Sequence, residues 1–282
     1  MKRFIMFYFL IFFAMIMLFS CGEPNGGDGN DNPDNNETIE AAFYEIQSDT
    51  KFVALNCVED LFSSMGQDEQ IVSFKEFMIN YINNVTQKVE RELGVEGIEL
   101  GLRKVSYIYN SVDVHNEPIQ LSSVAFWRGY YLNDEWHDLS PEDICLMEHY
   151  TITSDSECPT QGFPMELMIT GNTLTIMPDY LGYGLTRHLL HPYLNHEICA
   201  INSIDALPSA YTLFNDLSSA DMKEDWELSV LGASQGGGNA LAVHKYIDTH
   251  NDFANTWNFS HSYCAVGPHN PSLTIEKYFE SG

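Results

Sequence analysis

Basic residues are scarce in this chain. Of its 282 residues, 13 are Lys or Arg and 40 are Asp or Glu, which gives a formal net charge of −27 at pH 7. A surface this acidic repels the phosphates of nucleic acids and the headgroups of anionic membranes. The composition therefore argues against DNA or RNA as a partner, and solubility is the simplest role of the charge.

The chain also lacks an internal repeat and a motif for a metal or cofactor. His188, His191 and His196 lie close together in sequence. They fall in a proline-containing segment without an accompanying carboxylate motif, so loop histidines are a better interpretation than metal ligands. We expect neither a metal site nor a cofactor.

No apolar run reaches the roughly 20 residues of a membrane-spanning helix. The longest is residues 4–19, which follows two basic residues as in a secretory signal. The sequence Leu18-Phe19-Ser20-Cys21 resembles a bacterial lipobox. The resemblance implies cleavage before Cys21 and acyl chains on that residue. We therefore expect residues 1–20 to be a lipoprotein signal peptide, and the mature protein to be exported and lipid-anchored to the bacterial cell envelope, at the outer membrane.

Composition divides the rest of the chain into three parts. Residues 21–37 contain almost only Gly, Asn, Asp, Pro and Glu, which predicts a flexible tether. Residues 38–103 show no strand alternation, and the spacing of Phe74, Phe77 and Met78 is typical of helices. This part is predicted to be a helical N-terminal extension. Residues 104–282 are predicted to be the catalytic domain.

Strand and helix patterns alternate through residues 104–282. An antiparallel strand pair is predicted first, and from residue 144 onward strands and helices follow each other in turn, which favours an α/β fold with a mostly parallel sheet and helices on both faces. The predicted strands are 105–109, 121–127, 144–147, 174–177, 228–231 and 261–266, and the predicted helices are 164–169, 198–214 and 235–247.

The segment Gly232-Ala233-Ser234-Gln235-Gly236 lies where one predicted strand gives way to a helix. A turn this tight strains the backbone of Ser234, and glycines two residues to either side remove Cβ atoms that would collide. The serine hydroxyl would then stand clear of the sheet, beside free N–H groups of the helix start. Close packing alone is the competing interpretation of such a glycine-rich turn.

Three further motifs accompany this turn, namely Pro178-Asp179-Tyr180-Leu181-Gly182-Tyr183-Gly184, His191-Pro192-Tyr193-Leu194 and Gly267-Pro268. Together they resemble the α/β-hydrolase family, and more narrowly its secretory-lipase-type esterases. The resemblance implies that Ser234 is a nucleophile that forms an acyl-enzyme. It also implies an oxyanion hole that combines the backbone N–H of Gln235 with that of Tyr150 or Thr151, although Tyr150 stands where the family often has glycine.

The same resemblance implies a substrate pocket near His149, Asp179, Tyr180 and His191, with Asp179 in a structural loop at its mouth. In the family, the triad acid and histidine follow the nucleophile on loops after later strands. A single predicted strand follows the turn here. We therefore expect a C-terminally truncated domain, with a sheet that is incomplete at its C-terminal edge and with the acid and base beyond Gly282. The alternative is that His261 or His269, which flank the last predicted strand, substitutes as the base.

The resulting hypothesis is a serine carboxylesterase or lipase-like hydrolase that acts on a small ester or lipid and contacts the membrane only through its lipid anchor. A serine peptidase or an acyl transferase would use the same turn, because the turn does not define the leaving group. A non-catalytic surface lipoprotein that binds glycans or lipids is the alternative from another class. Its candidate stacking residues are Trp127, Tyr130, Tyr131 and Trp136.

Overall fold

The structure is a computed structural model that describes residues 39–63, 68–162 and 171–280. The predicted signal peptide, Cys21, the tether and the helix predicted at 164–169 lie outside the described residues. The described residues after position 38 belong to one compact unit.

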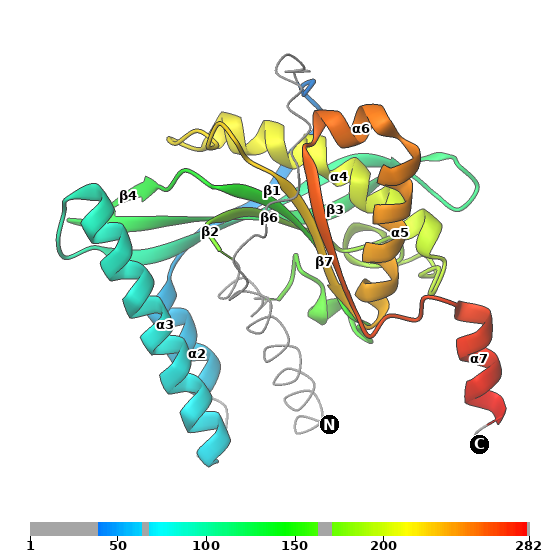
Figure 1. The fold of residues 1–282 in the computed structure, drawn as a ribbon, viewed down its shortest axis with the longest axis horizontal. Coiled ribbons are helices and arrows are strands. Elements are labelled where there is room, and N and C mark those ends of the chain that lie inside the picture. Colours follow the sequence, from blue (N-terminus) through cyan, green and yellow to red (C-terminus); the bar gives the residue numbers. More distant parts are fainter. Residues whose placement is uncertain (1–38, 64–67, 163–170, 281–282) are drawn as a thin grey trace, which may run out of the picture. The chain divides into compact units, whose positions relative to one another are not determined.

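A mixed sheet of eight strands runs through the described residues (Figure 1). Its order is β1-β2-β3-β6-β5-β7-β8, and β4 pairs with β3 outside this path. The strands are β1 (Glu45–Val53), β2 (Glu99–Val112), β3 (Pro118–Leu132), β4 (Glu135–Asp138), β5 (Asp143–Glu148), β6 (Thr173–Pro178), β7 (Leu228–Ala233) and β8 (Phe259–Ala265).

Two helices of the described residues lie between β1 and β2, and the others follow β6, β7 and β8. They are α2 (Ala54–Ser63), α3 (Glu69–Leu93), α4 (His196–Leu217), α5 (Gln235–Thr249), α6 (Asn251–Thr256) and α7 (Pro271–Glu280), with short 3₁₀ turns η1 (Asp155–Glu157) and η3 (Gly184–Thr186). The strands predicted between residues 105 and 266 and the helices predicted around α4 and α5 are confirmed, with bounds shifted by a few residues.

The prediction of a mostly parallel sheet is wrong. Four strand pairings of the described residues are antiparallel and three are parallel. The parallel pairings join β6, β5, β7 and β8, where helices connect successive strands. Short turns join β2 to β3 and β3 to β4 instead, and the second of them contains Asn133-Asp134 with φ of 52° and 66°. Two residues with positive φ form a hairpin turn, and a hairpin makes its strands antiparallel.

The prediction of a helical extension over residues 38–103 is wrong in part, because this segment also contains β1, which pairs antiparallel with β2 along its length. Helices α2 and α3 follow as expected. The side chains of β1 are mostly exposed, because this strand lies at the edge of the sheet. An edge strand with both faces largely in water has no alternation of apolar residues, so the sequence carried no signal for it.

Helices cover both faces of the sheet (Figure 1), as expected. Val105, Tyr107 and Tyr109 of β2 belong to the core cluster that α4 and α5 share, and the Tyr107 hydroxyl donates to the Ala206 carbonyl at 3.0 Å. Successive strand residues face opposite sides. The buried residues Leu100 and Leu102 therefore face the other side, where α2 and α3 pack on β2.

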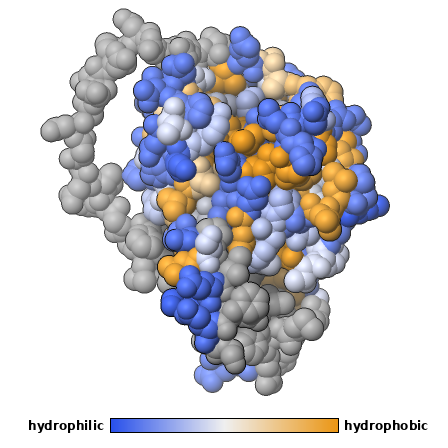
Figure 2. Space-filling model, turned by 90° about the vertical axis from the view of Figure 1, so that its right-hand side faces the viewer, coloured by the Kyte–Doolittle hydropathy of each residue, from blue (hydrophilic) through white to orange (hydrophobic). Residues whose placement is uncertain are grey.

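Strand β8 pairs only with β7 among the described residues. Tyr263 and Val266 at this edge are 42% and 73% exposed. Figure 2 looks onto this side of the molecule and shows apolar surface bordered by polar surface. A sheet that is incomplete at its C-terminal edge stays a prediction.

Candidate active site

The turn between β7 and α5 holds Ser234 in a strained conformation. Its φ is 56° and its ψ is −122°, a region that a residue other than glycine adopts at a cost of about 1–3 kcal/mol. Its side chain is exposed. No described residue hydrogen-bonds the Ser234 hydroxyl. The serine therefore presents its oxygen to solvent at the carboxyl end of a strand, where ligands bind in open α/β sheets.

Backbone contacts explain why glycines flank this serine. A Cβ atom on Gly232 would overlap the carbonyl oxygen of Gly236, and one on Gly236 would overlap the carbonyl oxygen of Glu148. The start of α5 therefore lies directly against the backbone of both β7 and the end of β5. This contact holds the serine turn against the segment that follows β5.

Two hydrogen bonds anchor the turn. The Ser234 N–H donates to the Ala265 carbonyl at 3.0 Å, and the Gly238 N–H donates to the Ser234 carbonyl at 3.3 Å. The N–H of Gln235 lies in the first turn of α5, where the helix offers no acceptor, and the positive end of the helix dipole adds to its field. This N–H is suited to an oxyanion at the serine.

The predicted second donors lie at the same edge of the sheet. Glu148 pairs with Gly232 in the parallel register of β5 and β7, so Tyr150 and Thr151 follow β5 beside the serine turn. Tyr150 is 38% exposed, and the Thr151 hydroxyl lies 3.3 Å from the Tyr193 hydroxyl. We call the segment from His149 to Thr151 the oxyanion loop.

His191 is brought next to the serine turn through Gln235. Its Nδ1 lies 2.7 Å from the Leu181 carbonyl, and its Nε2 lies 2.7 Å from Nε2 of Gln235. A carbonyl oxygen only accepts, so Nδ1 carries the proton and Nε2 accepts from the Gln235 amide. Burial also lowers the pKa of His191. The neutral His191 ring therefore orients the side chain next to Ser234, and its lone pair is already engaged.

His149 and Tyr180 form a stack beneath the oxyanion loop. Their ring centroids are 3.9 Å apart, and the Tyr180 hydroxyl donates to the His149 carbonyl at 3.1 Å. Burial lowers the pKa of His149 to about 4, so the ring is neutral near pH 7. Its Nδ1 lies 2.7 Å from the Tyr150 carbonyl. Both side chains therefore hold the backbone of the oxyanion loop in place through their hydrogen bonds.

Asp179 joins three segments through a buried carboxylate. It accepts hydrogen bonds from the Ser122 hydroxyl at 2.7 Å, the Thr160 N–H at 3.0 Å and the Thr160 hydroxyl at 2.6 Å. Burial raises its pKa to about 6, and a Cβ atom on Gly184 would collide with its carboxylate. These contacts hold the loop after β6 in place.

No described histidine, His261 and His269 included, hydrogen-bonds the Ser234 side chain. The described residues also contain no group of three or more His, Cys, Asp or Glu side chains placed to hold a metal. All five cysteines of the described part are free thiols. No helix of the described segments is long and apolar enough to cross a membrane.

The triad acid and base that the resemblance implies stay predictions, because no described histidine hydrogen-bonds Ser234.

Glu148 is the residue of this region that sequence reasoning missed. Its carboxylate is buried between β5, α4 and α5, at 2% exposure of the residue. The available signal was an acidic residue directly after the apolar run Ile144–Met147, a position where a charge has no water to solvate it.

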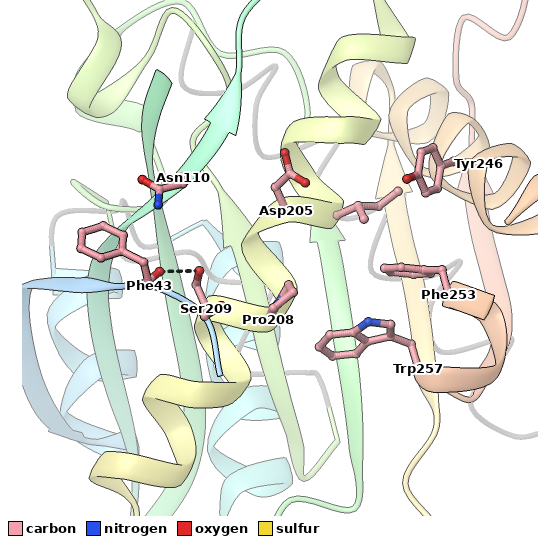
Figure 3. Close-up of a pocket in the computed structure, with 10 residues that line it drawn as sticks. Phe43, Asn110, Asp205, Pro208, Ser209, Tyr246, Phe253 and Trp257 are labelled. Atoms are coloured by element: carbon pink, nitrogen blue, oxygen red, sulfur yellow. Dashed lines mark hydrogen bonds between the residues drawn. The ribbon is translucent and has the colours of Figure 1, made fainter. Parts of the chain in front are cut away.

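A cavity of about 370 Å³ lies elsewhere, and its lining includes Asp205 of α4, Tyr246 of α5, Phe253 of α6 and Trp257 directly after α6. Tyr246 follows Ser234 by 12 residues in α5, a distance of about 18 Å along a helix. Figure 3 shows the Asp205 carboxylate pointing away from the rings of Phe253 and Trp257, and it accepts from Ser111. Because the polar and aromatic groups do not converge on one point, we assign no site to this cavity.

The strand order, the helices on both faces and the strained serine between β7 and α5 define the α/β-hydrolase fold. No protein-family model matches the chain, and no curated protein matches it in sequence.

The comparison with solved structures agrees with this fold. The chain is similar to the rice cell wall degrading esterase LipA from Xanthomonas oryzae, with a TM-score of 0.56, 18% identity and coverage of 82% of this chain and 52% of that chain. A ligand-bound form of LipA gives a TM-score of 0.57 at 18% identity, over 84% of this chain and 52% of that chain. A Legionella pneumophila protein that has been assigned as a hydrolase gives 0.55 at 18% identity, over 80% and 52%. The chain thus spans about half the length of each of these three structures.

Proposed function

We propose that the chain is a serine hydrolase that cleaves carboxylic esters through an acyl-enzyme on Ser234. The observation that carries the proposal is the conformation of Ser234, which is exposed at φ 56° between β7 and α5. Strain of this kind persists only where the surrounding structure enforces it, and it is concentrated at functional sites. The fold of esterase structures supports the same activity.

The reaction would proceed in two steps. The Ser234 oxygen attacks the ester carbonyl as a base takes the hydroxyl proton, and the carbonyl oxygen becomes an oxyanion that accepts from the Gln235 N–H and from Tyr150 or Thr151. The tetrahedral intermediate then expels the alcohol, which leaves with the proton from the base. Water attacks the acyl-enzyme in the same way and releases the carboxylic acid. We propose that the base and its acid partner come from outside the described residues.

Two features support a small ester or lipid as the substrate. The oxyanion loop carries exposed aromatic surface at Tyr150, and Tyr193 nearby is 54% exposed. Aromatic side chains of this kind bind apolar acyl groups. The strongly acidic composition favours neutral over anionic substrates.

The first test is covalent labelling of the full chain with a fluorophosphonate probe. We expect labelling of the wild type and none of Ser234→Ala, because the probe bonds to an activated serine oxygen. Ser272→Ala removes an exposed serine of α7 and should label as the wild type does. Labelling that persists in Ser234→Ala would assign the reactivity to another residue.

A substrate comparison separates the alternatives on the same fold. We expect hydrolysis of short p-nitrophenyl esters and none of dipeptide amides. Preferential cleavage of the amides would indicate a peptidase, and transfer of the acyl group to an added alcohol would indicate an acyl transferase. The alternative is a non-catalytic lipoprotein that binds glycans or lipids. It would be favoured if the probe does not label the wild type and if Ser234→Ala binds a glycan or lipid as well as the wild type does.

We also propose that Cys21 is lipidated and that the exported protein is anchored by this group at the outer membrane. The support is the basic and apolar order of residues 1–20 and the lipobox-like sequence before Cys21. Cells fed a labelled fatty acid should incorporate it into the wild-type protein, while Cys21→Ser should be unlabelled and released from the membrane fraction. Equal labelling of both proteins would exclude Cys21 as the acceptor.

A further inference from the structure

Glu148 occupies the junction of the two segments that would form the oxyanion hole. It is the last residue of β5 and directly precedes the oxyanion loop. It pairs with Gly232 of β7, and its backbone oxygen is the atom that a side chain on Gly236 would strike. A change in the position of Glu148 therefore moves the loop relative to Ser234.

The Glu148 carboxyl group is buried among polar atoms whose bonding is incomplete. No described residue makes a hydrogen bond of normal geometry with either carboxylate oxygen, and the Ser203 hydroxyl and the Asn239 side-chain nitrogen are likewise buried without a partner. Ser203, Asn239 and the Tyr180 hydroxyl all lie near enough to Glu148 to affect its titration. The Ser203 hydroxyl and the Asn239 amide thus lie near one carboxyl group without a hydrogen bond of normal geometry to it, whereas the Tyr180 hydroxyl already donates to the His149 carbonyl.

Burial without an ion-pair partner favours the protonated form of the Glu148 carboxyl group. No ion pair of the described residues includes Glu148, and an unpaired charge in a protein interior costs several kcal/mol. Burial raises the pKa of Glu148 to about 7, although the donors Tyr180, Ser203 and Asn239 act in the opposite direction. The group therefore carries its proton over much of the range below neutral pH.

We propose that Glu148 is a positioning residue of the hydrolase, which acts as a neutral carboxylic acid that links the oxyanion loop to α4 and α5 beneath the serine turn. This inference rests on the proposed function. The neutral acid has a donor and an acceptor for Asn239 and Ser203. The ionised group has only acceptors, and it places a negative charge next to the position where the oxyanion develops. Ionisation of Glu148 would therefore weaken the oxyanion hole.

The other titratable groups around Glu148 lie on each element that packs against it. They are His149 on its own segment, Tyr180 after β6, Cys199 and His196 on α4, and Tyr109 on β2. Burial raises the pKa values of Tyr180, Tyr109 and Cys199 far above neutrality, and burial lowers the pKa of His149 to about 4. A comparison of the wild type with a variant that differs only at residue 148 cancels the contribution of these groups, including His196.

The first test measures thermal unfolding of the full chain against pH for the wild type and Glu148→Gln. The folded state holds the Glu148 proton more tightly than the unfolded state, so the wild type should lose stability as pH rises from 4.5, the ordinary pKa, to about 7, the folded pKa. Relative to Glu148→Gln, the wild-type Tm should fall by about 5 °C or more across this window and stay level above it. If Glu148→Gln does not fold, Glu148→Met serves the same comparison, because it also has no proton to lose.

The second test measures the rate of fluorophosphonate labelling of Ser234 against pH. Above neutral pH the wild-type rate should fall by up to about tenfold per pH unit, while Glu148→Gln should keep its rate. A purely structural role would lower the rate of the variant without changing the shape of the profile.

The two tests separate the two proposals. Parallel Tm curves for the wild type and the variant would overturn the neutral carboxyl group whether or not the chain is an enzyme. Labelling profiles of equal shape would overturn the positioning role and leave the hydrolase intact. Absence of labelling in both proteins would count against the hydrolase, and the Tm comparison would still decide the state of Glu148.

Discussion

Gly236→Ala is expected to abolish labelling of Ser234 and to destabilise the fold severely. The added Cβ atom would overlap the carbonyl oxygen of Glu148 and come within 2.8 Å of the carbonyl oxygen of His149. Both are backbone atoms that cannot rotate away, so the oxyanion loop and the start of α5 must separate. We expect a loss of about 3 kcal/mol or more in the free energy of unfolding, at or above the usual range for overpacked sites.

Urea denaturation and fluorophosphonate labelling measure the two effects of Gly236→Ala. Gly171→Ala is the matched control, because its nearest neighbour would be the Thr173 methyl group at 3.9 Å, an ordinary contact. A Gly236→Ala protein with wild-type stability and labelling would show that the loop and the turn do not lie in contact as described.

Asp138→Ala is expected to have the second large effect. Asp138 accepts from the indole nitrogens of Trp127 and Trp136 at 2.7 and 2.8 Å, and from the Ser219 N–H at 3.0 Å. The Arg103 guanidinium lies 3.6 Å away, and the Asp138 side chain is only 3% exposed. One carboxylate therefore satisfies donors from β3, β4 and the segment after α4.

The loss expected for Asp138→Ala is about 3–5 kcal/mol in the free energy of unfolding, because buried donors and a buried charge lose their acceptor together. Arg103 keeps two hydrogen bonds to Asp49, at 2.9 and 2.7 Å. We therefore expect the Asp138→Ala protein to be less stable but still folded. Urea denaturation near pH 7 measures the loss. Asp248→Ala, at a 65% exposed carboxylate, should change stability little. A loss no larger than that of Asp248→Ala would show that the Asp138 cluster does not stabilise the fold.

Acid should weaken the same cluster. Burial alone would raise the pKa of Asp138, but hydrogen bonds from Ser219, Trp136 and Trp127 and the charge of Arg103 hold it below its ordinary value of 3.8. The stabilisation is therefore fully present above pH 3.8 and is lost as pH falls through the lower folded pKa. This window lies below that of Glu148, so the two effects are separable.

Most elements from residue 105 onward could be predicted because apolar runs and helical spacing report local burial, whereas the short elements β4, α6 and α7 were not predicted. Strand β1 could not, since the exposed residues of an edge strand carry no alternation. The sheet directions were mispredicted for a different reason. They depend on the connections between strands, and the short turn at Asn133-Asp134 was not recognised as a hairpin signal.

The serine turn could be predicted because its glycines and its flanking strand and helix are contiguous in sequence. The contacts of that turn with distant residues could not be predicted, although the resemblance placed His191 near the pocket. His191 meets Gln235 across 44 residues of chain, and Glu148 meets Asn239 and Ser203 only because three elements pack together. Such contacts are products of tertiary structure, and no local pattern encodes them.

The backbone contact between Gly236 and Glu148 also limits how this scaffold can be re-engineered. No side chain separates the two segments, so saturation mutagenesis at positions 232 and 236 would yield destabilised proteins rather than new binding properties. Variants that probe the proposed acyl-binding surface should concentrate on Tyr150, Thr151 and Tyr193, whose side chains lie at the same edge and whose replacement leaves that contact in place.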